Sequence, residues 1–214
     1  MSNTNLRYQN GLIKRDAVRE VRARMRRDGS LIPQSEKAVF ARLGYRPHYI
    51  IDTNVFFTII EYWGEDLRKG LIELCQVQAA LRLYLLDTVL SECRGSREKQ
   101  GLYDEIVFNG QNPEVGVIHP LDSGLARVCE LASRLLTAYE QTLDHITPSD
   151  KKDVLIAAAA IAYKMILLTR NKEDFVRIAK LAPELHFITL SGGEKADLAQ
   201  GAELLEYLAA DFRS

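Results

Sequence analysis

The 214-residue sequence predicts an α/β domain, a three-layer α/β/α sandwich around a five-stranded parallel sheet. From residue 48 onward, short apolar β-rich runs alternate with longer segments that have helical periodicity. The short runs are apolar at nearly every position, which is typical of strands buried on both faces. Strands that alternate with helices in this way form a parallel sheet covered on two sides.

The first half of this domain holds two predicted strands. HYIID, residues 48–52, is a short β-rich run, and the helical segments 54–63 and 66–82 follow it. LYLLD, residues 83–87, is the second strand, and the helix 88–100 follows it. Each strand is therefore followed by a helix, as parallel strand connections require.

The second half adds three predicted strands. VGVIHP, residues 115–120, contains Gly and Pro, and the strongly periodic helix 122–143 follows it. The cap signal TPSD precedes an alanine-rich, buried helix at 151–164. The remaining elements are the strands 165–169 and 186–190 and the helices 172–182 and 196–212.

The composition is that of a globular protein, with 47% hydrophobic and 27% charged residues, and this excludes a fibrous or wholly disordered chain. No apolar run reaches the roughly 18 residues of a membrane-spanning helix, and the first residues contain no apolar signal segment. The three cysteines, Cys75, Cys93 and Cys129, are widely spaced. We therefore expect a cytoplasmic protein without a disulfide framework and without a membrane partner.

The net charge of −1 hides an asymmetry along the chain. Residues 1–48 hold 11 Lys and Arg against 4 Asp and Glu, whereas the remainder holds 17 against 25. The sequence thus divides into a basic helical N-terminal extension, residues 1–47, and an acidic α/β domain, residues 48–214. Within the extension, 12–28 is a predicted helix.

Four arginines lie in one narrow sector of that predicted helix: Arg15, Arg19, Arg22 and Arg26. A row of arginines can contact the phosphates of a nucleic acid. Two other interpretations stay open. In the first, the arginines are the solvated face of a helix that docks by its apolar residues Ala17, Val21 and Met25. In the second, the row of arginines docks on an acidic patch of a second subunit, as in a homodimer.

Several acids are predicted at one edge of the sheet, because ligands of open parallel sheets bind beyond the carboxyl ends of the strands. Asp52 follows the first strand, Glu92 lies in the helix after the second, and Asp153 lies in the first turn of the alanine-rich helix. Asn171 and Asp174 follow the fourth strand. Clustered carboxylates repel one another, and a hard divalent cation such as Mg²⁺ or Mn²⁺ offsets that repulsion. Such a cation can promote the hydrolysis of a phosphodiester.

Each acid also has a structural interpretation. Asp52 can cap the helix that follows it, and Asp153 stands at capping-box spacing from Asp150. Glu92 and Asp174 can be ordinary solvated residues of their helices. The prediction of a metal site therefore depends on the whole set and its order along the chain.

Four segments in this order, IIDTNVFF, VLSE, DVLIAAAA and LLTRNKEDF, resemble the motifs of PIN-domain nucleases over residues 48–191. The family includes the toxin-type ribonucleases of toxin–antitoxin pairs. The resemblance implies an α/β/α sandwich and a ribonuclease that depends on Mg²⁺ or Mn²⁺. It also implies an RNA substrate and makes an antitoxin protein a partner to be tested.

Carried over residue by residue, the resemblance makes Asp52, Glu92 and Asp153 the metal-site acids. The fourth position stays open between Asp174 and Asn171, because Asn171 stands where many members have an acid. The supporting polar residues that it implies are Thr53, Asn54 and Thr169. Two alternatives remain: a nuclease of the same type that acts on DNA, and a non-catalytic domain that binds RNA or a protein.

Overall fold

The structure is a computed structural model. It describes residues 48–63, 65–77, 82–93, 97–107, 116–142 and 146–190, with Gly201, Leu204, Leu205 and Leu208 near the C-terminus. The predicted extension 1–47, with its arginine row, lies outside these residues, so its separation as a unit stays a prediction. In the described part of the chain, no helix is both long enough and apolar enough to cross a membrane.

Five parallel strands form the sheet, as the sequence predicted. They are β1 (His48–Ile51), β2 (Arg82–Leu86), β3 (Ile118–Leu121), β4 (Ile166–Thr169) and β5 (Phe187–Thr189). Their order in the sheet is β3-β2-β1-β4-β5. The chain moves outward from β1 to β3 and then returns to the other side of β1. A topological switch point therefore lies between β1 and β4, where ligands of such sheets bind.

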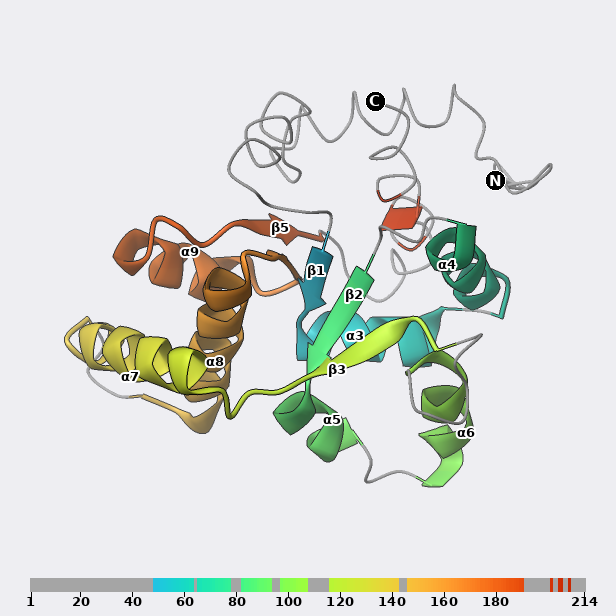
Figure 1. Cartoon of the computed structure of the whole chain (residues 1–214), viewed down its shortest axis with the longest axis horizontal. Helices are drawn as coiled ribbons and strands as arrows, with labels where there is room; N and C mark the ends of the chain where they lie inside the picture. The colour runs from blue at the N-terminus through green and yellow to red at the C-terminus, as the bar shows by residue number, and fades with distance from the viewer. Residues whose placement is uncertain are drawn as a thin grey trace.

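Helices follow the strands and cover the sheet. They are α3 (Thr53–Phe57), the π-helical turn η1 (Thr58–Tyr62), α4 (Glu65–Val77), α5 (Asp87–Cys93), α6 (Arg97–Ile106), α7 (Ala126–Glu140), α8 (Pro148–Tyr163) and α9 (Lys172–Leu181). In Figure 1, α7, α8 and α9 gather at one end of the molecule, and α4 and α6 at the other. The strands lie between these two groups, which gives the layered α/β architecture.

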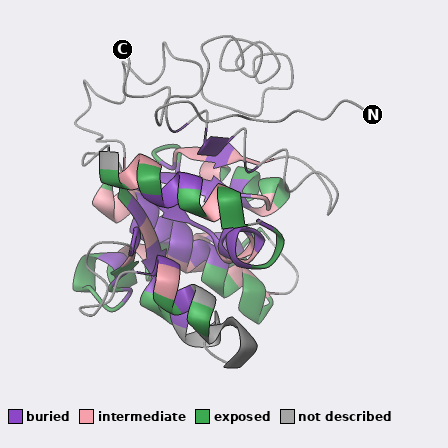
Figure 2. Ribbon diagram, turned by 90° about the vertical axis from the view of Figure 1, so that its right-hand side faces the viewer, coloured by how far each residue is buried: buried purple, intermediate pink, exposed green. Residues whose placement is uncertain are grey.

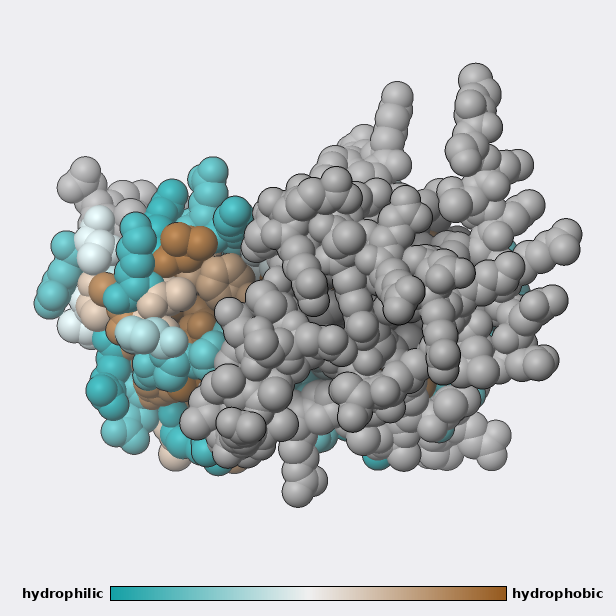
Figure 3. Space-filling view, turned by 90° about the horizontal axis from the view of Figure 1, so that it is seen from above, coloured by the Kyte–Doolittle hydropathy of each residue, from teal (hydrophilic) through white to brown (hydrophobic). Residues whose placement is uncertain are grey.

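The core surrounds the central strands. All four residues of β4 are buried, so both faces of the sheet are covered at this strand. The run Ala157–Ala160 of α8 is buried as well, and such small side chains let the helix lie close against β1 and β4. Figure 2 shows this buried interior with exposed residues on the outer sides of the helices. From above, the α7 and α9 end presents mostly hydrophilic residues around a smaller hydrophobic area (Figure 3).

Several predicted boundaries differ from the structure, and those around α5, α6 and β2 differ most. The predicted helix 88–100 is two helices, α5 and α6, and α6 continues to Ile106. Arg82, predicted as the end of a helix, is instead the first residue of β2, where its Nη1 lies 3.3 Å from Nε2 of His119. Arg82 differs because helical periodicity continues smoothly into a segment that pairs with β1 in the sheet.

Candidate active site

Asp52 lies at the carboxyl end of β1 and is only 3% exposed. Its backbone N–H donates to the Leu168 carbonyl at 2.9 Å, which joins the end of β1 to β4. One carboxylate oxygen, Oδ1, accepts the backbone N–H of Thr53 at 2.6 Å and so caps α3. The other, Oδ2, accepts the hydroxyl of Thr169 at 2.6 Å. Asp52 is therefore a helix cap and, at the same time, a buried carboxylate at the switch point.

Asp153 lies in the second turn of α8, whereas the sequence placed it in the first. The helix begins earlier, at Pro148, and the capping box is formed by Thr147 and Asp150. In that box Asp150 Oδ2 accepts the Thr147 backbone N–H at 2.7 Å, and Thr147 Oγ1 accepts the Asp150 backbone N–H at 3.2 Å. The capping interpretation of Asp153 is thus wrong, and its carboxylate is buried at 6% exposure.

The segment after β4 brings two further predicted residues to this place. The side-chain amide of Asn171 donates to Oδ2 of Asp153 at 3.1 Å and to Oδ2 of Asp174 at 2.5 Å. The second oxygen of Asp174, Oδ1, accepts Nη1 of Arg177 at 3.1 Å, in an ion pair one turn apart on α9. Asp153 and Asp174 are therefore neighbours although they come from different helices.

The acids influence one another electrostatically. Burial first, and then the charges of Asp52 and Asp174, raises the pKa of Asp153 to about 7. Burial also raises the pKa of Asp52, and the hydrogen bonds from Thr169 and Thr53 offset part of that increase. Three acids from β1, α8 and α9 thus share one region of negative charge, as the sequence predicted from their positions after the strands.

Glu92 lies on α5, the helix that follows β2, as predicted. Its side chain is outside the described residues, so its role as a metal-site acid stays a prediction. The same holds for Arg15, Arg19, Arg22 and Arg26 in the N-terminal extension. The helix α5 contacts β2 and β3, the two strands on the side of β1 opposite to β4.

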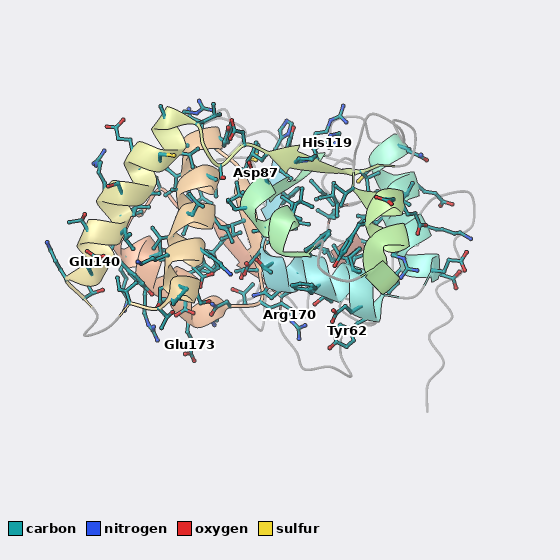
Figure 4. All side chains as sticks on the ribbon, turned by 90° about the horizontal axis from the view of Figure 1, so that it is seen from below. Tyr62, Asp87, His119, Glu140, Arg170 and Glu173 are labelled. Carbon is teal, nitrogen blue, oxygen red and sulfur yellow. The ribbon has the colours of Figure 1, made fainter. Side chains whose placement is uncertain are left out.

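A polar contact that the sequence did not reveal lies beside the acids. The backbone N–H of Arg170 donates to Oδ1 of Asn54 at 3.0 Å, and its guanidinium donates to Oγ1 of Thr58 at 2.9 Å. Thr58 in turn donates to the Asn54 carbonyl at 2.8 Å. Figure 4 shows Arg170 next to α3. The only sequence signal was its place directly after Thr169, the last residue of a strand.

The side chains of this site suit a hard divalent cation, because the acids and the nearby hydroxyls can offer only oxygen atoms as metal ligands. Burial, and after it the charge of neighbouring carboxylates, raises the pKa of both Asp52 and Asp153. A bound cation would therefore offset the cost of burying these charges and the repulsion between them. Within the described ranges, no three His, Cys, Asp or Glu side chains form a ready ligand set. Asp52, Asp153 and Asp174 are the described residues that would hold a cation after their side chains adjust.

Comparison with protein families decides the classification. The model of the PIN domain matches residues 49–181, more than half of the chain. The chain belongs to the PIN domain family. PIN-domain nucleases are hydrolases and generally use divalent metal ions. The recognised resemblance and the predicted fold are thereby confirmed, and the matched range contains every acid discussed above.

Solved structures similar to this PIN domain include VapBC2 from Rickettsia felis bound to a DNA fragment from its promoter. That chain is 23% identical, with a TM-score of 0.49, and the match covers 67% of this chain and 99% of that one. DNA-bound VapBC from Salmonella typhimurium is 16% identical, with a TM-score of 0.48 and coverages of 66% and 97%. FitAcB from Neisseria gonorrhoeae is 17% identical, with a TM-score of 0.43 and coverages of 66% and 96%. No curated protein matches the chain.

Proposed function

We propose that this PIN domain is an endoribonuclease that hydrolyses RNA phosphodiester bonds with Mg²⁺ or Mn²⁺. The observation that supports the proposal is the convergence of Asp52, Asp153 and Asp174 at the β1/β4 switch point. Two of the three are buried, and burial with neighbouring carboxylates raises the pKa of Asp153 to about 7. Such a shift by burial and like charge is typical of functional acids.

In this proposal Asp52, Asp153 and Asp174 hold the cation, and Glu92 adds a fourth carboxylate from α5. The cation, when bound, polarises the phosphodiester and makes water a better nucleophile. Thr169 and Thr53 hold the Asp52 carboxylate in one orientation through their 2.6 Å hydrogen bonds. This fixed orientation matters because catalytic groups lose rate when they are misplaced by even an ångström.

The test is cleavage of matched RNA and DNA strands by the wild-type protein, Asp52→Asn and Glu173→Gln. Glu173 is the matched control, because it is an exposed acid of the same helix as Asp174 and points outward (Figure 4). RNA should be cut with Mg²⁺ or Mn²⁺ and left intact in excess EDTA. Asp52→Asn should reduce the rate by at least about 100-fold, since even residues behind a metal ligand contribute 10–100-fold. Glu173→Gln should cut at the wild-type rate.

The other outcomes identify the alternatives. Cleavage of DNA in place of RNA would show the DNA-directed nuclease. Binding of RNA without metal-dependent cleavage of either strand would show a non-catalytic domain. Full cleavage in EDTA would refute the metal requirement, and wild-type activity of Asp52→Asn would refute the assignment of Asp52.

We also propose that the biological role is that of the toxin in a toxin–antitoxin pair, which rests on family membership alone. The informative experiment expresses the chain with and without the product of the adjacent reading frame. We expect the chain to arrest growth only when Asp52 is intact. We also expect the neighbouring protein to relieve the arrest by forming a stable complex with the chain. Growth arrest that the neighbouring protein leaves unchanged would contradict this role without affecting the nuclease proposal.

A further inference from the structure

Asn171 stands at the N-cap position of α9, yet its side chain makes no capping hydrogen bond. Asparagine at this position usually accepts a backbone N–H of the first turn. Here the amide nitrogen lies 3.1 Å from Oδ2 of Asp153 and 2.5 Å from Oδ2 of Asp174. The side chain thus donates to two carboxylates, one on α8 and one in the first turn of α9, in place of capping the backbone of α9.

The chemistry of the partners fixes the orientation of this amide. An ionised carboxylate only accepts hydrogen bonds, and an amide NH₂ has two hydrogens to donate. Each hydrogen therefore serves one of the two acids, Asp153 and Asp174. The opposite orientation would bring the amide oxygen against two carboxylate oxygens and add repulsion. In this arrangement Asn171 is a donor to the acids and does not act as an oxygen ligand.

The backbone of the same residue extends the connection to the third acid. The Asn171 N–H donates to Oγ1 of Thr169 at 2.9 Å, and the Thr169 hydroxyl donates to Oδ2 of Asp52 at 2.6 Å. Thr169 is fully buried. One residue thus reaches all three carboxylates, two directly through its side chain and one through a buried hydroxyl.

We propose that Asn171 is a positioning residue that holds Asp153 and Asp174 together in the metal-free protein and yields these carboxylates to the cation on binding. The proposal rests on the metal-dependent function proposed above. The amide donates partial positive charge between two carboxylates that otherwise repel. A cation would do the same with full charge and would use the same two carboxylates, so amide and cation would compete for them.

This competition predicts a direction that separates the two hypotheses for Asn171. If the amide competes with the cation, removing it destabilises the metal-free state more than the metal-bound state. The affinity for the metal then increases. If Asn171 is a ligand, removing it removes a metal contact, and the affinity decreases. The sign of the change in metal affinity therefore decides between the roles.

The experiment measures Mn²⁺ binding by calorimetry, and thermal unfolding in EDTA and in saturating Mn²⁺, for the wild type, Asn171→Ala and Gln141→Ala. Gln141 is the control, because it is an exposed amide that follows α7. Asn171→Ala should bind Mn²⁺ roughly tenfold more tightly, the factor that one hydrogen bond to a charged group is worth. It should unfold at a lower temperature in EDTA and gain more from Mn²⁺ than the wild type. Gln141→Ala should match the wild type throughout.

Weaker Mn²⁺ binding by Asn171→Ala would overturn the proposal and make Asn171 a ligand. Unchanged binding together with unchanged unfolding in EDTA would overturn it as well. If the wild type binds no Mn²⁺, the metal-dependent function fails, and the EDTA unfolding temperatures alone decide whether Asn171 holds the acids. Asn171→Ser keeps one hydrogen-bond donor and should change the Mn²⁺ affinity and the unfolding temperature in the same directions but by less. It provides a second variant if the alanine variant does not fold.

Discussion

The Asp153 carboxyl group should make the metal-free protein less stable as pH rises. Its pKa in the folded protein is about 7, above the ordinary value of 3.8, because of burial and then the charges of Asp52 and Asp174. Between these two values the folded state binds a proton that the unfolded state has lost, so the free energy of unfolding falls from about pH 4 to pH 7. Asp153→Asn removes this contribution. In EDTA at pH 8 the variant should be more stable than the wild type, by on the order of 2 kcal/mol.

Urea unfolding in EDTA across pH 4 to pH 8 measures this difference. The two proteins should be about equally stable near pH 4, should diverge between about pH 4 and pH 7, and should differ by a constant amount above pH 7. Glu173→Gln is again the control, because its exposed side chain lies outside the buried acids. A constant difference between Asp153→Asn and the wild type at all pH values would show that Asp153 ionises normally in the folded protein.

At the scale of single residues, sequence positions predicted that Asp52, Asp153 and Asp174 come together, but not what each side chain does. The sequence predicts three of the metal-site acids from their positions after strands or in the first turns of helices, namely Asp52, Asp153 and Asp174. The capping role assigned to Asp153 belongs to Asp150, since α8 begins three residues before the predicted start. The donor role of Asn171 depends on a carboxylate 18 positions away, and local patterns carry no signal for such a contact.

At the scale of elements, a buried glycine near the C-terminus lies against Trp63 and against Leu67 of α4. Gly201 is helical and buried, and a Cβ placed there would lie 2.6 Å from Cε2 of Trp63 and 2.9 Å from Cδ1 of Leu67. Trp63 is buried at 3% exposure and has little room to move. Gly201→Ala should therefore destabilise the protein by about 1–3 kcal/mol, the usual cost of overpacking a core. Urea unfolding measures the change.

Gly101 of α6 is the matched control for this prediction. It is also helical, but it is exposed, and a Cβ placed there meets nothing within 4 Å. Gly101→Ala should stabilise the protein by about 0.5–1 kcal/mol, because alanine loses less backbone entropy in a helix. Stabilisation by both substitutions would show that Gly201 does not pack closely on Trp63.

Helix boundaries were the least predictable part of the fold, and the alternation of elements the most. The alternation reflects burial, which every strand residue of β4 experiences on both faces. The place of Arg82 in β2 depends on pairing with a distant segment, because Arg82 is in register with His48 of β1. Propensity within a short window does not contain that information.

At the scale of the whole molecule, the strand order explains why acids far apart in sequence meet. The order β3-β2-β1-β4-β5 places the ends of β1 and β4 side by side, and Asp52 and Thr169 lie at those ends. The acidic site then needs positive charge elsewhere to attract a polyanion. Residues 1–48 hold 11 Lys and Arg against 4 acids, which makes the predicted N-terminal helix the natural source.

The contribution of that helix can be measured by replacing Arg15, Arg19, Arg22 and Arg26 with Gln. Glutamine keeps helix propensity and polarity, so the substitution removes four charges with little other change. If the arginines contact RNA, affinity should fall, because each phosphate contact releases about 0.7 counterion from a single strand. The slope of log affinity against log salt should flatten by up to roughly 3 for four contacts.

RNA binding is measured in an Asp52→Asn background, so that the substrate stays intact during the salt titration. Arg134→Gln on α7 is the control, because it removes an exposed charge of the α/β domain and should leave the slope nearly unchanged. An unchanged slope with a lower molecular mass in solution would instead show that the arginines dock on a second subunit. If slope and mass are both unchanged, the arginines form a solvated helix face, and the RNA must be attracted by cations nearer the acids.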